Sequence, residues 1–441
     1  MKGQFYKEKR HKLLEKVKDN SVIVLFAGNA PKKTADEAYP FTPNRNFYYL
    51  TGVEEPDHIL LMSKINGEEK SILFIKDIDL ELEKWIGKSL RENEALEIAG
   101  VDEVMFKSAF EGYIHRVISI KEDFNLYLDL ERDEFKSVDS ISQAFAKEII
   151  SKYPQVSVRN IYASIAALRL IKSDEEIENM KEAIKITIAG VETLMKNAKA
   201  GMKEYELEAY FDFNCKSKGV KDLAFNTIAA AGKNATVLHY VDNNSEMKDG
   251  DLILFDLGAQ YKYYNADISR TFPISGKFTA RQKEVYNAVL KVNEEIINTI
   301  KPGITTAELN AKANDLLGEA CVSLGLLEDK KDFRKYYFHS IGHSLGLDTH
   351  DVIIDRNFTF EPGMVYTVEP GLYIPEESIG IRIEDDILVT EDGSINLTKD
   401  MIKTVEEIED FMSRNRINMK LSSSVVFMQP NIAAMGKIDL K

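Results

Sequence analysis

The chain has 441 residues, enough for two or three domains with full hydrophobic cores. Apolar residues make up 44% and charged residues 29%, which excludes collagen-like, linker-dominated and disordered proteins. With 57 Lys and Arg against 72 Asp and Glu, the net charge is −15, which repels phosphate backbones and anionic membranes. We therefore expect no nucleic-acid and no membrane partner.

The first 160 residues or so show the pattern of a mixed α/β unit. A charged helical pattern is followed by short apolar runs at 21–27, 58–62, 71–75 and 126–130, with polar segments between them. Runs of this length are typical of strands. The alternation predicts a sheet covered by helices.

Three capping boxes mark helix starts further along the chain. They lie at residues 173–176, 279–282 and 305–308, each with Ser or Thr followed three residues later by Glu or Gln. The two side chains of a capping box satisfy backbone N–H groups that are free in the first helical turn. An apolar pattern of helical spacing follows each box, so we predict three helix N-termini there.

An internal echo relates two stretches of this second unit. Residues 250–258 form an apolar strand pattern between two glycines that ends in Asp256, and residues 363–371 repeat the layout with Glu369. Each glycine and acid of the second stretch lies 113 positions after its counterpart, and similar helix joints precede both stretches. We infer two similar halves, each made of two helices and a hairpin with a buried acid. Chance similarity is the alternative.

Each of the two strands faces a second acid across its hairpin. With a turn centred on Tyr261 and Lys262, Asp256 would lie directly opposite Asp267. Opposed side chains on one sheet face have Cβ atoms about 5 Å apart. Two like charges that follow apolar strands are poorly relieved by water, so this pair is destabilising on its own.

The same construction recurs for Glu369 and Glu384, with a turn centred on Glu376 and Glu377. Two divalent ions about 3.5–4 Å apart, with a bridging water or hydroxide as nucleophile, would resolve the repulsion among four converging acids. Oxygen-rich ligands favour Mn²⁺ or similar ions over structural Zn²⁺. The alternative is that all four acids are surface residues on exposed strands.

Histidines are the second group of candidates. His339, His343 and His350 fall in one short stretch, in which Gly342 and Gly346 oppose a regular helix. His339 and His343 are therefore not expected to form a helical metal pair. One histidine would complete a metal shell, and the others would stabilise a developing oxyanion or transfer a proton.

Two further residues are placed by the echo and by strand geometry. His239 precedes Asp256 by 17 residues and His350 precedes Glu369 by 19, so the two histidines are approximate counterparts. Arg382 shares the strand face of the acid two residues beyond it. It would orient a ligating carboxylate, and a generic salt bridge is the alternative.

The spaced set Asp256, Asp267, His343, Glu369 and Glu384 resembles the ligands of the metallopeptidase family with the "pita-bread" fold. Within that family the similarity is to Xaa-Pro aminopeptidases (aminopeptidase P) and prolidases. The phrases that carry it lie at residues 255–259, 265–272, 339–343, 368–371 and 380–384. Residues 44–52 resemble the creatinase-type N-terminal domain, and residues 168–173 the interdomain junction.

The resemblance implies an α/β (α+β) protein. Residues 1–160 would form a creatinase or aminopeptidase P-type N-terminal domain, and residues 161–412 a pseudo-twofold pita-bread catalytic domain. Residues 413–441 would be a C-terminal tail of unknown role. Family relatives often pair through the N-terminal domain, so a homodimer or homotetramer is implied. Two cysteines, Cys215 and Cys321, suit a reducing compartment, and we expect a cytoplasmic protein.

The resemblance also implies roles at the site. Asp256 would bind one metal, His343 and Glu369 the other, and Asp267 and Glu384 would bridge both. A bridging hydroxide would attack the carbonyl carbon of the bond before proline, with Glu369 handling its proton. Mn²⁺ is expected, with Co²⁺, Zn²⁺ or Fe²⁺ as alternatives. The other expected residues are His239 and His350, which would contact the substrate and the tetrahedral intermediate, and His339 and Arg382, which would support the site.

The expected activity is removal of the N-terminal residue from peptides with proline in second position. A prolidase restricted to Xaa-Pro dipeptides is the closest alternative, because the catalytic residues do not separate the two. An inactive peptidase-like binding protein and a creatinase-like hydrolase without metal are disfavoured by the complete ligand set. Phe225 departs from the family, which often has Tyr there. Trp85 would wall a neighbouring subunit's cleft or else lie in the core.

Overall fold

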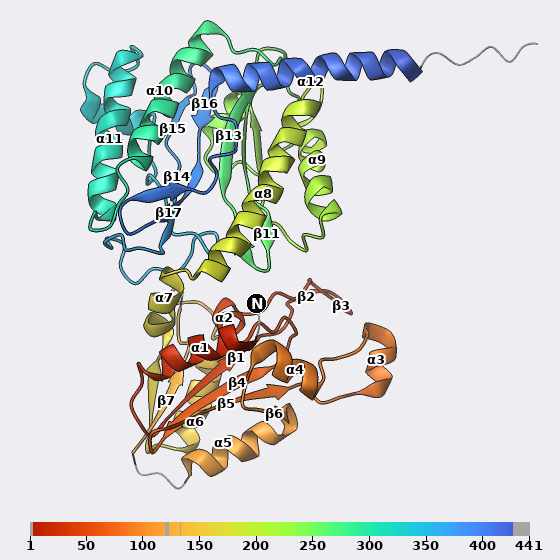
Figure 1. Ribbon diagram of the computed structural model, residues 1–441, viewed down its shortest axis with the longest axis vertical. Helices are drawn as coiled ribbons and strands as arrows, with labels where there is room; N and C mark the ends of the chain where they lie inside the picture. Colours follow the sequence, from red (N-terminus) through yellow and green to blue (C-terminus); the bar gives the residue numbers. More distant parts are fainter. Residues whose placement is uncertain (1–2, 120–122, 133, 427–441) are drawn as a thin grey trace, which may run out of the picture. The chain divides into compact units, whose positions relative to one another are not determined.

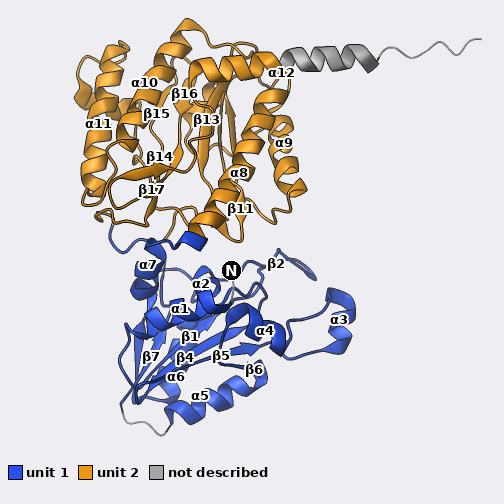
Figure 2. Ribbon diagram, viewed as in Figure 1, with its two compact units in different colours: residues 1–175, 352–355 blue, residues 176–351, 356–441 orange. Residues whose placement is uncertain are grey.

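The computed structural model describes residues 3–119, 123–132 and 134–426, with side chains to residue 415. The chain separates into two compact units (Figure 2). Unit 1 comprises residues 1–175 and 352–355, and unit 2 comprises residues 176–351 and 356–441. The domain boundaries expected from the sequence stay predictions.

Unit 1 is built on a six-stranded mixed sheet with the order β6-β5-β4-β1-β7-β8. The apolar runs expected as strands are confirmed. Val22, Val24 and Leu61 on one sheet face pack with Phe110 of helix α5 in a single core. The strands are β1 (Ser21–Phe26), β4 (Ile59–Ile65), β5 (Glu68–Ile75), β6 (Glu103–Phe106), β7 (Phe124–Leu128) and β8 (Val156–Asn160), beside the small hairpin β2 (Lys32–Thr34) and β3 (Glu37–Ala38).

Helices flank this sheet in unit 1 (Figure 1). β4 is antiparallel to both β1 and β5, whereas β7 is parallel to β1 and β8, as expected for an α/β unit. The helices are α1 (Gly3–Leu14), α2 (Arg45–Thr51), α3 (Leu80–Ile86), α4 (Glu92–Ala99), α5 (Phe110–Ile118), α6 (Ile141–Lys152) and α7 (Tyr162–Leu170).

Unit 2 contains the two halves expected from the internal echo. In each half, two helices precede a strand hairpin: α8 (Asp174–Asn197) and α9 (Glu204–Ser217) in the first, α10 (Ala280–Ile297) and α11 (Thr306–Ser323) in the second. The hairpin strands are β10 (Leu252–Leu257) and β13 (Ile268–Pro273), then β14 (Val365–Val368) and β17 (Asp385–Val389). This repetition agrees with the pseudo-twofold arrangement expected from the sequence.

Shorter elements complete the two sheets of unit 2. β9 (Ile228–Ala231) adds to β10, and β18 (Ser394–Asn396) adds to β17, giving the orders β13-β10-β9 and β14-β17-β18. The hairpins are extended by β11 (Gln260–Tyr261) with β12 (Tyr264–Asn265), and by β15 (Gly371–Ile374) with β16 (Ile379–Arg382).

The predicted helix starts agree with these elements. α8 begins at Asp174, directly after the first expected N-cap. At α10 the Thr279 side chain accepts from Gln282 N and the Gln282 side chain accepts in return. Thr305 and Glu308 do the same at α11. Both capping boxes are therefore confirmed.

Of the two predicted hairpin registers, one is wrong and one is right. In the first hairpin Asp256 pairs with Ser269, not with Asp267, because the turn is centred on Lys262 and Tyr263. Both turn residues have positive φ, of 47° and 64°, as a tight two-residue hairpin turn requires. Asp267 still lies on the same sheet face as Asp256, one diagonal step away.

The second register follows the prediction. β14 pairs with β17 and β15 with β16 on one continuous alignment, in which Val368 faces Asp385 and Gly371 faces Arg382. Glu369 and Glu384 fall opposite each other between these ladders. The C-terminal helix α12 (Val405–Val426) enters the segment expected as a tail, and the rest of that segment lies outside the described residues. Among the helices described, none is long and apolar enough to span a membrane.

Candidate metal centre and active site

The structure brings the five expected metal ligands together inside unit 2. Ligand atoms of Asp267, His343 and Glu384 all lie within 4.8 Å of one another. His343 Nε2 is 3.4 Å from Asp267 Oδ2 and 3.8 Å from Glu369 Oε1. Asp256 joins the group electrostatically, because its charge helps raise the pKa of Asp267. Two ligands come from the first half and three from the second.

His343 is held on the edge of β14 by a close backbone approach. Its N–H donates to Thr367 Oγ1 at 3.0 Å, and Thr367 N donates back to His343 O at 2.9 Å. A Cβ on Gly342 would lie 1.9 Å from Thr367 O, so only glycine fits there. The glycine that argued against a helix therefore lets this segment lie against the strand, where no helix forms.

The tautomer of His343 points its lone pair at carboxylates. Its Nδ1 donates to Ser344 O at 3.1 Å, which leaves Nε2 as an acceptor facing Asp267 and Glu369. Burial lowers the pKa of His343 to about 4, and His350 adds to this effect, so the ring is neutral at pH 7. Three electron-rich atoms that face one another fit a cation between them.

The raised pKa values of the acids in the cluster also indicate a site for a cation. Burial, followed by repulsion from Glu384 and Asp256, raises the pKa of Asp267 well above its usual range. Burial likewise raises the pKa of Glu384, and that of Glu369 to about 8. Oδ1 of Asp256 and Oδ1 of Asp267 are buried without a hydrogen-bond partner among the described residues. The donor set therefore fits hard divalent ions, which would satisfy both oxygens.

Arg382 connects the two hairpins at the site. Its Nη2 donates to Asp256 Oδ2 at 2.7 Å, Nη1 to the Tyr373 hydroxyl at 2.9 Å and Nε to Ser269 Oγ at 2.9 Å. Ser269 Oγ in turn donates to Glu384 Oε2 at 2.6 Å. One guanidinium therefore fixes a ligand of the first half and, through a serine, a ligand of the second.

Tyr373 and Ser269 are functional residues that the sequence reasoning missed. His339 Nδ1 donates to Ser340 O at 2.8 Å, so its Nε2 accepts the Tyr373 O–H at 2.9 Å. Burial and Arg382 lower the pKa of His339 to about 3, so the ring stays neutral. The correct first register would have revealed Ser269, because it lies directly opposite Asp256.

His239 and His350 lie at the exposed side of the cluster. The ring centroid of His350 is 4.2 Å from that of His343. Burial lowers the pKa of His350, and a positive His239 would lower it further. His239 likewise disfavours a charge on His339, although its own side chain is exposed. The two exposed histidines are available to a molecule that approaches the acids from solvent.

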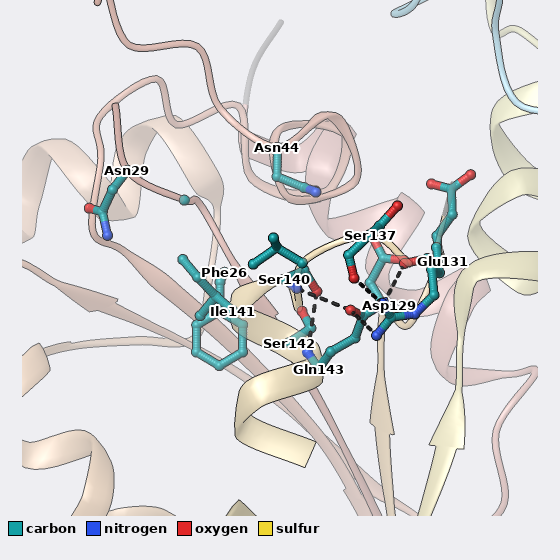
Figure 3. A pocket seen from close by; sticks show the side chains of 13 residues that line it. Phe26, Asn29, Asn44, Asp129, Glu131, Ser137, Ser140, Ile141, Ser142 and Gln143 are labelled. Carbon is teal, nitrogen blue, oxygen red and sulfur yellow. Dashed lines mark hydrogen bonds between the residues drawn. The ribbon is translucent and has the colours of Figure 1, made fainter. Parts of the chain in front are cut away.

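A separate hollow of about 410 Å³ lies in unit 1 (Figure 3). Its polar wall is already paired internally: Arg132 donates to Ser137 O at 2.5 Å and to Gln143 Oε1 at 2.7 Å, and Gln143 also closes the capping box of α6 with Ser140. None of the predicted site residues lines it. We assign it no ligand.

Two residues singled out in the sequence lie elsewhere. Trp85, on α3 of unit 1, is 86% exposed, so the core alternative is wrong. Phe225 lies in the loop before β9 and is half-buried.

Two buried and two half-buried acids surround a neutral histidine, and an arginine orients one of them, which is the donor set expected of a metal-dependent hydrolase. Comparison with known proteins gives the particular family. Residues 178–391 match the model of "Metallopeptidase family M24", and residues 6–127 match "Aminopeptidase P, N-terminal domain". The Xaa-Pro aminopeptidase of Escherichia coli (strain K12) is 34% identical over 93% of this chain and 97% of its own. Xaa-Pro aminopeptidase 3 of Homo sapiens is 34% identical over 93% and 86%.

Solved structures agree. A Bacillus anthracis protein whose structure was assigned to aminopeptidase P superposes with a TM-score of 0.92 at 50% identity, covering 95% of this chain and 100% of that one. The E. coli aminopeptidase P with the inhibitor Pro-Leu gives 0.87 at 33% identity, covering 95% and 99%. The chain therefore belongs to the aminopeptidase P group of metallopeptidase family M24, and it is a hydrolase.

Proposed function

We propose that this enzyme hydrolyses the peptide bond between an N-terminal residue and a following proline, as a metal-dependent Xaa-Pro aminopeptidase. The observation that carries the proposal is the cluster of Asp267, His343 and Glu384, with Glu369 beside His343, in a chain whose relatives bear that name over most of their length. The bond before proline is a tertiary amide without an N–H. A site that needs no such N–H is suited to cleave it.

Five residues would hold the ions. Asp256 would bind one, His343 and Glu369 the other, and Asp267 and Glu384 both. Two divalent ions bound here would activate a water molecule as nucleophile and polarise the scissile carbonyl. Mn²⁺ is our first choice because four of the five ligands offer oxygen, with Co²⁺, Zn²⁺ and Fe²⁺ as alternatives.

The surrounding residues would act on protons and on the substrate. Glu369 would take the proton of the nucleophile and return one to the leaving nitrogen. His239 and His350 would donate to the developing oxyanion from the exposed side. Arg382 would orient Asp256 through their hydrogen bond, and Tyr373 would hold His339 neutral with its Nε2 as acceptor.

A second copy of the chain is the partner that we propose for unit 1. Ile78, Leu80, Trp85 and Ile86 at α3 expose 39%, 67%, 86% and 67% of their surface. Apolar side chains gathered on so short a segment are typical of a protein interface. A homodimer or homotetramer would cover them. Light scattering of the wild type and of Trp85→Ala tests this, and a monomeric wild type would contradict it.

We place the enzyme in the cytoplasm. Cys215 and Cys321 are both buried free thiols, as expected where thiols stay reduced.

The deciding assay follows release of the N-terminal residue from an Xaa-Pro-Yaa tripeptide and from an Xaa-Pro dipeptide by Mn²⁺-supplemented enzyme. Cleavage of the tripeptide supports the aminopeptidase. Cleavage of the dipeptide alone would make the enzyme a prolidase, and cleavage of neither by metal-loaded enzyme would overturn the proposal. Asp267→Asn, which removes a ligand charge from a buried position, is the negative control.

A further inference from the structure

The loop that carries His239 is organised around one buried carboxylate outside the metal cluster. Glu204, the first residue of α9, is completely buried. Residues 232–245 leave the end of β9, pass through His239 and return to the start of α9. A carboxylate in such a place is tolerated only when hydrogen bonds satisfy both oxygens.

Both oxygens of Glu204 are saturated by the two ends and the middle of this loop. Oε1 accepts from Ala231 N at 2.8 Å and from Asn234 Nδ2 at 3.0 Å. Oε2 accepts from Tyr240 O–H at 2.8 Å and from Ser245 N at 2.9 Å. Four donors match the four acceptor sites of an ionised carboxylate, and one of them is the residue next to His239.

The rest of the loop has firm supports on either side. At its end, Glu204 N donates to Ser245 O at 3.0 Å, so the first turn of α9 binds the returning chain. At its start, a Cβ on Gly380 would lie 2.0 Å from Ala235 O, so the loop rests on β16. Leu238 and Tyr240 pack against a core that includes Tyr373. In the central segment the Tyr240 hydroxyl donates to Glu204, and the same hydroxyl lies 3.4 Å from Ser245 Oγ, so Glu204 is one of its polar supports.

We propose that Glu204 is a positioning residue, which fixes the loop of residues 232–245 and thereby holds His239 at the mouth of the metal centre. This inference rests on the proposed function, because it takes His239 to contact the substrate. Glu204→Gln tests it sharply. The amide NH₂ replaces an acceptor by a donor, so it faces either Asn234 Nδ2 with Ala231 N or Tyr240 O–H with Ser245 N.

The expected result is a fall in kcat/KM of about 10- to 100-fold with the wild-type content of two Mn²⁺ per chain. Amide hydrogen exchange should accelerate in residues 232–245 and stay unchanged in β10 and β13. Glu206→Gln is the matched control: it makes the same change of charge in the first turn of α9, at an exposed capping glutamate. It should keep wild-type exchange and activity.

A double-mutant cycle with His239→Ala separates positioning from general destabilisation. If Glu204 acts through His239, Glu204→Gln adds less than about twofold to the loss in that background. Multiplication of the two losses, or loss of metal in Glu204→Gln, would overturn the proposal.

Two provisions keep the test decisive. Should Glu204→Gln not fold, Tyr240→Phe removes one donor, and the same cycle applies. A wild type without peptidase activity would refute the proposed function, whereas unchanged exchange of residues 232–245 in Glu204→Gln would refute the role of Glu204.

Discussion

Arg382 Nη2 and Asp256 Oδ2 form a 2.7 Å charge-assisted hydrogen bond, which leaves Asp256 Oδ1 buried and free for an ion. The guanidinium thus occupies Oδ2 of Asp256 and leaves Oδ1 available to a metal ion. It also reaches Ser269 and Tyr373, so three of its nitrogens are engaged.

Arg382→Lys should therefore lower the affinity for Mn²⁺ by about 10- to 100-fold. A lysine keeps the charge but cannot make the three directed contacts of the planar fork. Titration calorimetry of the metal-free protein with Mn²⁺ measures the effect. Arg281→Lys, at an exposed ion pair with Glu377, is the control and should bind like the wild type. Equal affinities of both variants would contradict the orienting role.

Metal binding should release protons, and more of them at pH 7 than at pH 9. The pKa of Glu369 is about 8 without metal, so its carboxyl is largely protonated at pH 7 and must lose its proton to bind an ion. Above pH 9 this proton is already gone. Calorimetry in buffers of different ionisation enthalpy counts the protons. A count that does not change with pH would refute the raised pKa.

Chelation should abolish activity and lower the unfolding temperature. Without ions the acids at the site must bind protons to avoid repelling one another, and the folded state also loses the stabilisation that a tightly bound ligand provides by mass action. Differential scanning calorimetry with and without EDTA tests this. Restored activity and stability on adding Mn²⁺ exclude irreversible damage, whereas full activity after metal removal would refute the mechanism.

Gly342→Ala should destabilise the protein by about 2–4 kcal/mol and weaken metal binding. The new Cβ would meet Thr367 O at 1.9 Å, so the His343 segment must separate from β14. Urea unfolding gives the free energy. Gly393→Ala is the control, because a Cβ there meets nothing within 4 Å. A Gly342→Ala variant as stable as Gly393→Ala would show that the segment adapts freely.

Unit 1 should lose stability on mild acidification because of His58. Burial outweighs the attraction of Asp57 and lowers the pKa of this histidine to about 4. The folded state thus binds fewer protons than the unfolded one, whose histidine titrates near 6.5. Stability is complete above pH 6.5 and falls by about 2 kcal/mol at pH 5. His58→Asn, which keeps an acceptor but cannot titrate, should reduce this pH dependence, and an unchanged dependence would contradict the assignment.

Sequence reasoning succeeded where pattern and spacing decide the structure. The strands of unit 1, the capping boxes at Thr279 and Thr305 and the pairing of Glu369 with Glu384 follow from periodicity and turn position. Sequence reasoning failed where the conformation of one or two residues sets the position of a turn. The turn at Lys262 and Tyr263 needs two positive φ values at residues that rarely adopt them. The predicted turn was therefore placed one residue too early, and Ser269 was not recognised as the residue opposite Asp256.

Tyr373 shows a different kind of limit. Its hydroxyl joins Arg382 to His339, yet nothing in a hairpin sequence distinguishes a tyrosine that packs from one that relays a hydrogen bond. Trp85 was equally ambiguous, because exposure depends on what covers a helix and not on the residue itself. The convergence of the acids was easier to predict than either residue, because acids on neighbouring apolar strands repel one another unless protons or cations lie between them. Their role as metal ligands stays a prediction.

The division of the ligands between the halves has a consequence for assembly of the enzyme. Asp256 and Asp267 belong to one half, and His343, Glu369 and Glu384 to the other, so neither half alone carries a complete centre. During folding, Asp256 and Asp267 can meet the other ligands only after a segment about a hundred residues further along the chain has folded. Until an ion binds, the acids can lie together only if they take up protons. Tight metal binding is therefore expected only after both halves have been synthesised and have docked, because each half supplies part of the ligand set.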